Sequence, residues 1–246
     1  MTRRRFANSA NPAFDCGTGV ILLPFGRQSY LAAAVERYRG ERLGLDETTD
    51  RLVYELHEEA EGLTLVYSGM GSPAAANALE MAAANGGRRV VLFGACGGVR
   101  EDVAVGDLVV ATGGVRGEGT SGYYAPAAFP AACDPLLTAE LWRAVGGDGP
   151  RAHRGVVYTT DAGYRQGPEI YEECAGLVVG VECECAASAV VAARLGLELG
   201  TLLFVTDNVT RPGPEEHDYR GLADERVRSA FERGLATAVE VLAASV

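Results

Sequence analysis

The feature that most constrains the fold is a regular alternation of short apolar runs with alanine-rich or amphipathic segments, from Gly19 to Val209. The apolar runs are almost continuously hydrophobic, which is typical of strands buried on both faces. They cover residues 19–24, 63–69, 89–95, 106–112, 155–161, 176–182 and 199–207. The segments that predict helices cover residues 28–39, 72–85, 135–145, 185–195 and 222–244. This alternation predicts an α/β domain with a central, largely parallel or mixed sheet.

The chain shows no sign of internal division. Its 246 residues contain no repeat, low-complexity tract or linker, so we expect one domain over residues 1–246. The formal net charge of −11 argues against nucleic acid or an anionic membrane as partner, because both require clustered lysine and arginine. No apolar run approaches the roughly 18 residues of a membrane span, and no apolar core follows the basic start as in an export signal. We therefore expect a cytoplasmic protein with a small-molecule partner.

Cysteine and histidine give no sign of a metal site. The histidines have no metal-ligand spacing to one another or to cysteine, so we expect neither a metal nor a cofactor. The cysteines lie mostly in apolar segments of a chain too large to need disulfides, which predicts reduced, buried thiols. Cys96, in "GACGG", has no obvious base beside it and is interpreted as a small core side chain. The six cysteines are Cys16, Cys96, Cys133, Cys174, Cys183 and Cys185.

A glycine-rich loop follows the second apolar run, in "VYSGMGSPAAANALE". Gly69, Gly71 and Ala74 fit the dinucleotide fingerprint G-x-G-x-x-A between a strand and a helix. The next strand, however, lacks the acid that would hold a ribose hydroxyl of such a cofactor. These glycines instead suit another ligand that approaches the backbone at a helix N-terminus. Ser72 and Pro73 are predicted as the N-cap and first residue of that helix.

Two acids interrupt an apolar stretch at "VGVECECA". Glu182 and Glu184 flank Cys183, and an unpaired buried carboxylate costs several kcal/mol or more. If the strand continues, both acids point to one side and can accept hydrogen bonds from the vicinal hydroxyls of a sugar. If a helix begins near residue 184, the acid there only complements the helix dipole.

A third acid closes the last apolar run, in "LLFVTDN". Asp207 lies at the strand edge where ligands collect in α/β proteins. Burial there would raise its pKa and allow it to act as a proton donor near neutral pH. Arg220 follows thirteen residues later and could orient the acid or stabilise developing charge.

These segments together resemble the nucleoside phosphorylase family, which includes bacterial purine nucleoside phosphorylase and uridine phosphorylase. The similar blocks, between about Val20 and Asn208, are "SGMGSPAAANALE", "GACGGVREDVAVGDLVVATGGVRGEGTSGYYAP", "GVVYTTDAGY", "VGVECECA" and "LLFVTDN". The resemblance implies a three-layer α/β sandwich around a mixed, partly barrel-like sheet. It also implies a homo-oligomer, as a dimer, trimer or hexamer, with its sites near subunit contacts.

The resemblance assigns roles to the acidic residues. It implies that Glu184 is the main ribose-hydroxyl ligand and Glu182 its partner, with Cys183 in place of a methionine that lines the sugar. It implies that Asp207 protonates a purine as the glycosidic bond breaks, because uridine-specific relatives lack this acid. Arg220 matches a supporting arginine of purine-specific relatives.

The phosphate side departs from the family pattern. The shortened loop "LPFGRQ" keeps Gly26 and Arg27, and with Gly71 they are the best candidates for the anion or water side. Leu92 and Ala95, however, stand where an arginine and a hydroxyl are expected, which weakens phosphate binding.

Other residues could compensate on the anion side. An arginine lent by a neighbouring subunit could be Arg51 or Arg42. Arg116 and Glu118 are either substitutes for the missing ligands or a solvated ion pair, and the second interpretation is favoured.

The base side departs as well. Gly163, before Tyr164, replaces the aromatic ring that stacks on the base, which leaves room for a larger base. We therefore predict an enzyme that cleaves the N-glycosidic bond of a purine-type nucleoside, with phosphate as co-substrate. The alternatives are a nucleosidase that uses water and a nucleoside-binding protein without turnover.

Overall fold

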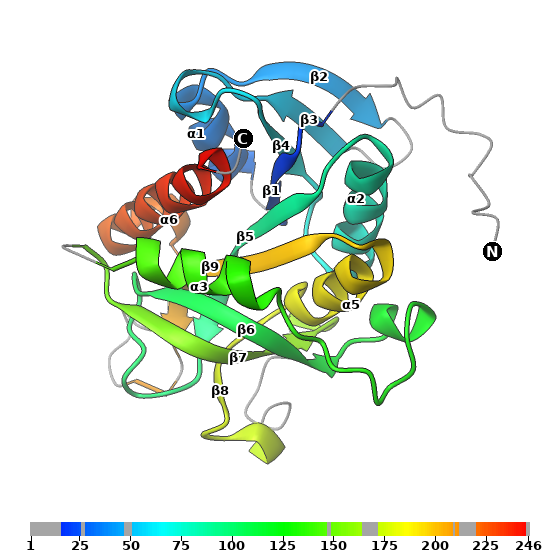
Figure 1. Ribbon diagram of the computed structural model, residues 1–246. Coiled ribbons are helices and arrows are strands. Elements are labelled where there is room, and N and C mark those ends of the chain that lie inside the picture. Colours follow the sequence, from blue (N-terminus) through cyan, green and yellow to red (C-terminus); the bar gives the residue numbers. More distant parts are fainter. Residues whose placement is uncertain are drawn as a thin grey trace.

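The computed structural model describes residues 16–25, 28–46, 51–146, 149–163, 172–208, 210–211 and 220–244. Within these ranges nine strands and five α-helices form a mixed α/β structure (Figure 1). The strands are β1 (Gly19–Leu23), β2 (Glu41–Asp46), β3 (Arg51–Glu55), β4 (Leu63–Tyr67), β5 (Arg89–Gly98), β6 (Leu108–Gly117), β7 (Ala152–Thr160), β8 (Val178–Glu182) and β9 (Glu198–Asn208). The helices are α1 (Gln28–Arg37), α2 (Ser72–Ala84), α3 (Pro135–Ala144), α5 (Cys185–Leu195) and α6 (Glu225–Ala243). Every strand and helix expected from the sequence is present.

The sheet closes on itself over part of its width. The strand order is β2-β3-β4-β1-β5-β8-β7-β6-β9, and β5 also pairs with β9, so the last five strands form a ring. Parallel pairs such as β1–β5 and antiparallel pairs such as β5–β8 both occur, which makes the sheet mixed. The expected mixed, partly barrel-like sheet is therefore confirmed.

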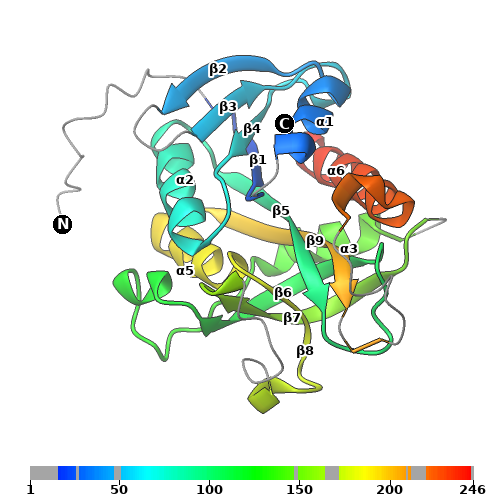
Figure 2. The same cartoon turned by 180° about the vertical axis from the view of Figure 1, so that it is seen from behind.

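Helices cover both faces of the sheet and give the three layers that the resemblance implies. Helices α2 and α5 pack against each other on one face, whereas α1, α3 and α6 lie on the other (Figures 1 and 2). The first face is lined mainly by small side chains from α2 and α5, which allow these helices to approach the strands closely. This close approach brings the start of α2 to the end of β8, where the acidic pair lies.

The opposite face is filled by an aromatic cluster. Phe93 of β5, Phe204 of β9 and Phe231 of α6 have ring centroids 5.5–5.7 Å apart, a spacing that favours aromatic contact. Phe25 and Tyr30 complete the cluster, so α1 and α6 are held to the barrel by the same rings. Of the helices in the described ranges, none has the length and apolar character needed to cross a bilayer.

A short antiparallel pair at the edge of the sheet was not expected from the sequence. Strands β2 and β3 pair with each other, and β3 continues onto β4. Their sequences, "ERLGLD" and "RLVYE", mix charged and apolar residues and are too short to show a clear period of two. Edge strands buried on one face give only this weak signal.

The start of α2 corrects one prediction. The N-cap is Gly71, with φ of 106°, and the helix begins at Ser72, so Pro73 is the second helical residue. Ser72 therefore does not cap the helix, and its hydroxyl donates to the carbonyl oxygen of Cys183 at 2.7 Å. Glycine suits position 71 because other residues rarely adopt a φ near this value.

Gly234, in the middle of α6, provides a test of the packing. A Cβ at this position would lie 2.5 Å from Cε2 of Phe93, so the helix can approach the aromatic cluster only without a side chain. Alanine normally stabilises a helix by about 1 kcal/mol relative to glycine. Here overpacking should outweigh that gain, and Gly234→Ala should lower the free energy of unfolding by about 1–3 kcal/mol in denaturant titrations. Ala236→Gly, in the same helix, is the control that measures the effect of helix propensity. A Gly234→Ala variant more stable than the wild type would contradict the close contact between α6 and Phe93.

Candidate functional site

Glu182 ends β8 and is buried, with 3% of its surface exposed. Its Oε2 accepts hydrogen bonds from the backbone amides of Glu184 and Cys185, both at 2.7 Å. Its Oε1 accepts a hydrogen bond from the hydroxyl of Thr159 on β7. Protein donors thus engage both oxygens, and Glu182 satisfies the first amides of α5, which would otherwise be unpaired.

Glu184 lies between β8 and α5 and is buried to 4% exposure. Its Oε1 accepts a hydrogen bond of 2.5 Å from the amide of Gly71, at the N-terminus of α2. The hydroxyl of Ser72 fixes the same junction through the Cys183 carbonyl. Glu184 therefore points away from its own helix and toward the start of another.

The two acids thus face two different helix N-termini. Glu182 receives the amides of α5, and Glu184 receives an amide of α2. Both arrangements place negative charge at the positive end of a helix dipole. The helix-start interpretation expected Glu184 to do this for its own helix, α5, but Glu182 takes that place. The sugar interpretation survives for Glu184, because the backbone hydrogen bonds from Gly71 and Cys183 use only part of the hydrogen-bonding capacity of a carboxylate.

Burial and the charges of neighbouring acids raise the pKa of both carboxylates. Burial raises the pKa of Glu182 to about 7, against the opposing effect of its three hydrogen-bond donors. Burial first, and the charge of Glu182 second, raise the pKa of Glu184 well above its usual value. Glu182 has more hydrogen-bond donors than Glu184, and these donors oppose the rise in its pKa.

Asp207 lies at the end of β9 and is half-buried. Its Oδ1 accepts a hydrogen bond of 2.8 Å from the hydroxyl of Thr206. Its Oδ2 faces Gly97 of β5, where a Cβ would lie only 3.3 Å away. Gly97 is paired with Asp207 on one side and with Val181 of β8 on the other, so one residue of β5 separates the ends of β8 and β9.

Cys96 shows that the acids belong to one site. Its thiol is buried, and its pKa is raised by burial and then by the charges of Glu182 and Asp207. Both acids therefore lie within electrostatic range of one sulfur atom. The prediction that Cys96 is a small core side chain is confirmed, and this part of the core lies within electrostatic range of both acids.

The remaining predicted site residues are distributed as follows. Gly71 and Cys183 lie at the junction of α2 with the acidic segment. Gly163 is half-buried just after β7, and Arg220 is exposed before a short 3-10 helix at Gly221–Ala223. Gly26, Arg27, Tyr164 and the side chain of Arg51 lie outside the described part of the structure.

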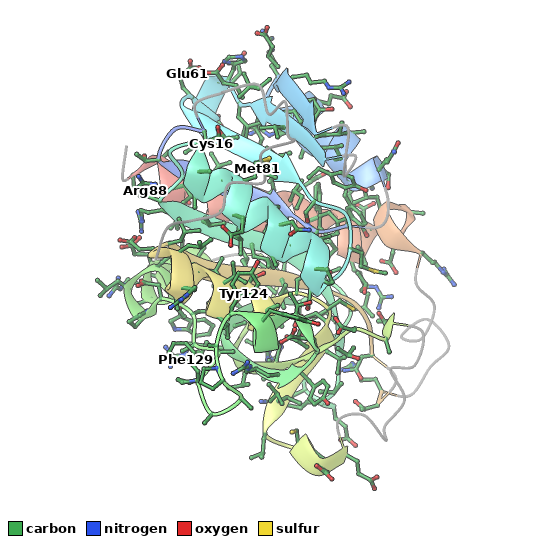
Figure 3. The ribbon with its side chains drawn as sticks, turned by 90° about the vertical axis from the view of Figure 1, so that its right-hand side faces the viewer. Cys16, Glu61, Met81, Arg88, Tyr124 and Phe129 are labelled. Atoms are coloured by element: carbon green, nitrogen blue, oxygen red, sulfur yellow. The ribbon has the colours of Figure 1, made fainter. Side chains whose placement is uncertain are left out.

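Arg116 is a structural residue, so the expected solvated ion pair with Glu118 is wrong. Its guanidinium donates to the hydroxyl of Ser121 and to the carbonyl oxygens of Ala125, Pro126, Ala127 and Phe129. These bonds fix the segment after β6, which lies beside α2 and α5 and carries Tyr124 and Phe129 (Figure 3). Glu118 instead accepts from the amide of Ser121 at 2.9 Å, and its charge contributes to the raised pKa of Glu182.

The side chains of Leu92 and Ala95, which differ from the family pattern, cannot serve as ligands of an anion. Leu92 is fully buried in the core beneath α2 and α5, and Ala95 is half-buried. Neither side chain can donate a hydrogen bond to an anion. Any anion at this site must therefore be held by other groups.

Sequence reasoning missed two hydroxyl groups that support the acids. Thr159 donates to Glu182 and accepts from the amide of Ala186, whereas Thr206 donates to Asp207. Both residues lie in strands, and in the sequence they cannot be told apart from other β-branched strand residues. Only their register opposite the acids gives them a role, and a single sequence does not reveal register.

Comparison with known proteins identifies the family of the chain. The Phosphorylase superfamily model matches residues 21–246. The guanosine phosphorylase of Halorubrum lacusprofundi is 30% identical over 174 residues, 70% of this chain and 72% of that protein. The uridine phosphorylase of Treponema pallidum is 31% identical over 192 residues, 73% of this chain and 72% of that protein. The purine nucleoside phosphorylase of Toxoplasma gondii, solved with immucillin-H, shares the fold with a TM-score of 0.82 and 18% identity, over 94% of this chain and 92% of that one.

The chain has an α/β fold, with its candidate site at the ends of β8 and β9. The chain belongs to the Phosphorylase superfamily. Its relatives there are nucleoside phosphorylases, so it is an enzyme that acts on N-glycosyl bonds. The family membership supports this interpretation over that of a binding protein without turnover.

The raised pKa values predict how stability depends on pH. A buried acid whose folded pKa lies above its unfolded value stabilises the fold at low pH, and this contribution is lost as pH rises through the folded pKa. Glu184→Gln removes one such group and its repulsion of Glu182. The melting temperature of the variant relative to wild type should therefore rise between about pH 5 and pH 8, by roughly 2–4 °C for each 1 kcal/mol recovered.

Scanning calorimetry at several pH values measures this difference. Glu232→Gln, a change at an exposed position of α6, controls for the loss of one surface charge. A melting difference for Glu184→Gln that is the same at all pH values would show that Glu184 does not titrate as a buried acid.

Proposed function

We propose that this enzyme cleaves the N-glycosidic bond of a purine nucleoside by phosphorolysis. The observation that carries the proposal is the placement of Glu182 and Asp207 within electrostatic range of one buried thiol, with Glu184 beside them. A pentose bound to Glu184 would then place its base toward Asp207. The similarity to a guanosine phosphorylase supports the purine assignment.

Glu184 is proposed to bind the ribose hydroxyls. Its carboxylate is buried and held by the Gly71 amide, so its direction is fixed before substrate binds. Two vicinal hydroxyls can donate to such a carboxylate and favour its ionised form. Glu182, whose two oxygens are already engaged, is proposed to support this geometry from behind, and Cys183 to line the sugar.

Asp207 is proposed as the general acid. As the bond between C1′ and the base nitrogen stretches, the sugar develops positive charge and the base develops negative charge. Protonation of the base at this stage is worth about 10²–10⁴-fold in rate. Because Thr206 holds Oδ1, the proton is carried on Oδ2, the oxygen that faces Gly97. Arg220 is proposed to stabilise the same charge.

The base and anion sides complete the proposal. Gly163 and Tyr164 are proposed to line the base. Gly26 and Arg27 are proposed to hold phosphate, with Arg51 or Arg42 lent by a second copy of the chain. Gly71, expected on this side from the sequence, instead uses its amide to hold Glu184.

Hydrolysis is the second candidate, and a specific observation favours it. Leu92 is fully buried among apolar side chains where the family pattern has an arginine, and Ala95 has no hydroxyl. A site with fewer donors binds phosphate more weakly and leaves the nucleophile position to water.

Asp207→Asn tests the assignment of the general acid. The variant should lose about 100-fold or more of kcat on purine nucleosides, because an amide cannot donate the proton to the leaving base. Binding of a nucleoside should persist, since the sugar is held by Glu184. Steady-state kinetics with guanosine and inosine measure the rate, and an unchanged kcat would reject Asp207 as the acid.

The choice of nucleophile is tested by product analysis. Purine and pyrimidine nucleosides are incubated with and without inorganic phosphate, and the sugar product is identified by mass spectrometry. Phosphorolysis predicts ribose 1-phosphate, formed only when phosphate is present. Free ribose formed at the same rate without phosphate would establish the nucleosidase instead.

Thr206→Val tests the support of Asp207. Valine keeps the shape and removes the hydroxyl that stabilises the carboxylate as it loses its proton, so kcat should fall about tenfold. The alkaline limb of the pH–rate profile should also move to higher pH, because the ionised acid has lost a donor. Thr206→Ser keeps the hydroxyl and should behave as wild type. A lower rate with no change in the alkaline limb of the pH–rate profile would show that Thr206 acts only through packing.

A further inference from the structure

Two buried thiols outside the proposed chemistry lie against the same hydroxyl group. Cys133 Sγ lies 3.6 Å from Thr201 Oγ1, and Cys185 Sγ lies 3.7 Å from the same atom. The side chains of the two cysteines also form a hydrogen bond with each other. All six cysteines are free, and these two share one hydroxyl group as their neighbour.

The backbone on both sides of the pair is anchored. The amide of Cys133 donates to the carbonyl oxygen of Thr112 at 3.1 Å, and Asp134 beside it donates to the carbonyl oxygen of Leu199 at 2.8 Å. Cys185 is the first residue of α5, and its amide holds Oε2 of Glu182 at 2.7 Å. The thiol pair therefore connects the segment before α3 with the turn that holds the acidic site.

We propose that Cys133 and Cys185 form a reversible disulfide when the protein meets a hydroperoxide, and that this bond distorts the site at Glu182 and Glu184. The juxtaposition of two sulfurs around Thr201 is the observation that carries the proposal. Nothing in the cleavage of an N-glycosidic bond requires either thiol.

The oxidation proceeds in two steps, with hydrogen peroxide as the oxidant. Cys133 sulfur attacks one peroxide oxygen, so that an S–O bond forms, the O–O bond breaks and hydroxide leaves as water. Cys185 sulfur then attacks Cys133 sulfur, so that the S–S bond forms and the S–O bond breaks, and a second water leaves with the Cys185 proton. Two thiols lose two electrons in total and the peroxide gains them.

The order of the two cysteines follows from their surroundings. The hydrogen bond from Cys185, and a smaller effect of Thr201, lower the pKa of Cys133. The pKa of Cys185 is raised by the same pairing and by burial. Because Cys133 keeps 6% of its surface exposed and Cys185 none, peroxide reaches Cys133 first and Cys185 resolves the intermediate.

The bond would act on the site through α5. A disulfide requires the sulfurs to come within about 2.05 Å, which is much closer than a hydrogen-bonded contact. Since the backbone of Cys133 is held by β6 and β9, closing the bond would pull on the first turn of α5. That turn supplies two of the three donors to Glu182, and displacement of about 1 Å can reduce a rate up to about 100-fold.

The test uses the full chain with Cys174→Ser, which removes the one cysteine that is not buried. The reduced protein is treated with hydrogen peroxide, its free thiols are alkylated in denaturant, and tryptic peptides are analysed by mass spectrometry. Cleavage at Arg143 and Arg154 separates the two cysteines, and fragment ions distinguish Cys185 from Cys183. We expect a loss of about 2 Da and a peptide pair that links Cys133 to Cys185.

The second readout is nucleoside cleavage, which rests on the proposed function. We expect the rate to fall about tenfold or more with the linkage and to return after dithiothreitol. In the same background, Cys133→Ser and Cys133→Ala should form no linkage and keep their rate after peroxide.

Several outcomes would overturn the proposal. Alkylation of both cysteines after peroxide, linkage between other cysteines, or oxidation of Cys133 without linkage would reject the thiol pair. Linkage with an unchanged rate would reject its coupling to the site. If the reduced protein cleaves no nucleoside, the proposed function fails, but the mass measurement still decides the thiol pair.

Discussion

The burial of two carboxylates at the start of two helices is the constraint on which the site depends. Glu182 and Glu184 are 3% and 4% exposed, a position that costs several kcal/mol for an unpaired acid. The amides of α5 offset this cost for Glu182, and the amide of Gly71 offsets part of it for Glu184. Two helices with small side chains must therefore approach the same strand end. The pKa values of both acids stay raised, so these hydrogen bonds do not fully offset the cost of burial. Acids in this state are typical of a site where a ligand supplies further hydrogen-bond donors.

The barrel then brings the third acid to the same place. Pairing of β5 with both β8 and β9 sets Gly97 between Val181 and Asp207, so acids that are distant in sequence meet across one glycine. A side chain at position 97 would crowd Asp207, and a side chain at position 71 would strain the turn that reaches Glu184. The glycines of this family pattern are thus required by close approach and by backbone conformation.

Much of this could be predicted from sequence, because near-continuous apolar runs mark seven strands, and alanine-rich or amphipathic segments mark the five helices. The edge strand β2 and its neighbour β3 could not, since they mix charged with apolar residues and are stabilised by their neighbours. The acids were identified because charge in an apolar run is conspicuous. The roles of Thr159, Thr206 and Arg116 depend on register and loop path, which tertiary packing decides.

The central claim is that Glu184 binds the pentose and that the sugar's hydroxyl donors lower its raised pKa. Calorimetric titration with a C-nucleoside, whose base–sugar bond is not cleaved, measures this directly when repeated in buffers of different ionisation enthalpy. Donation to the carboxylate lowers its pKa on binding, so at neutral pH the account predicts release of up to about one proton per bound nucleoside and tighter binding as pH rises. The release should disappear in Glu184→Gln. Binding by the wild type with no proton exchange at any pH between about 6 and 8 would contradict the account.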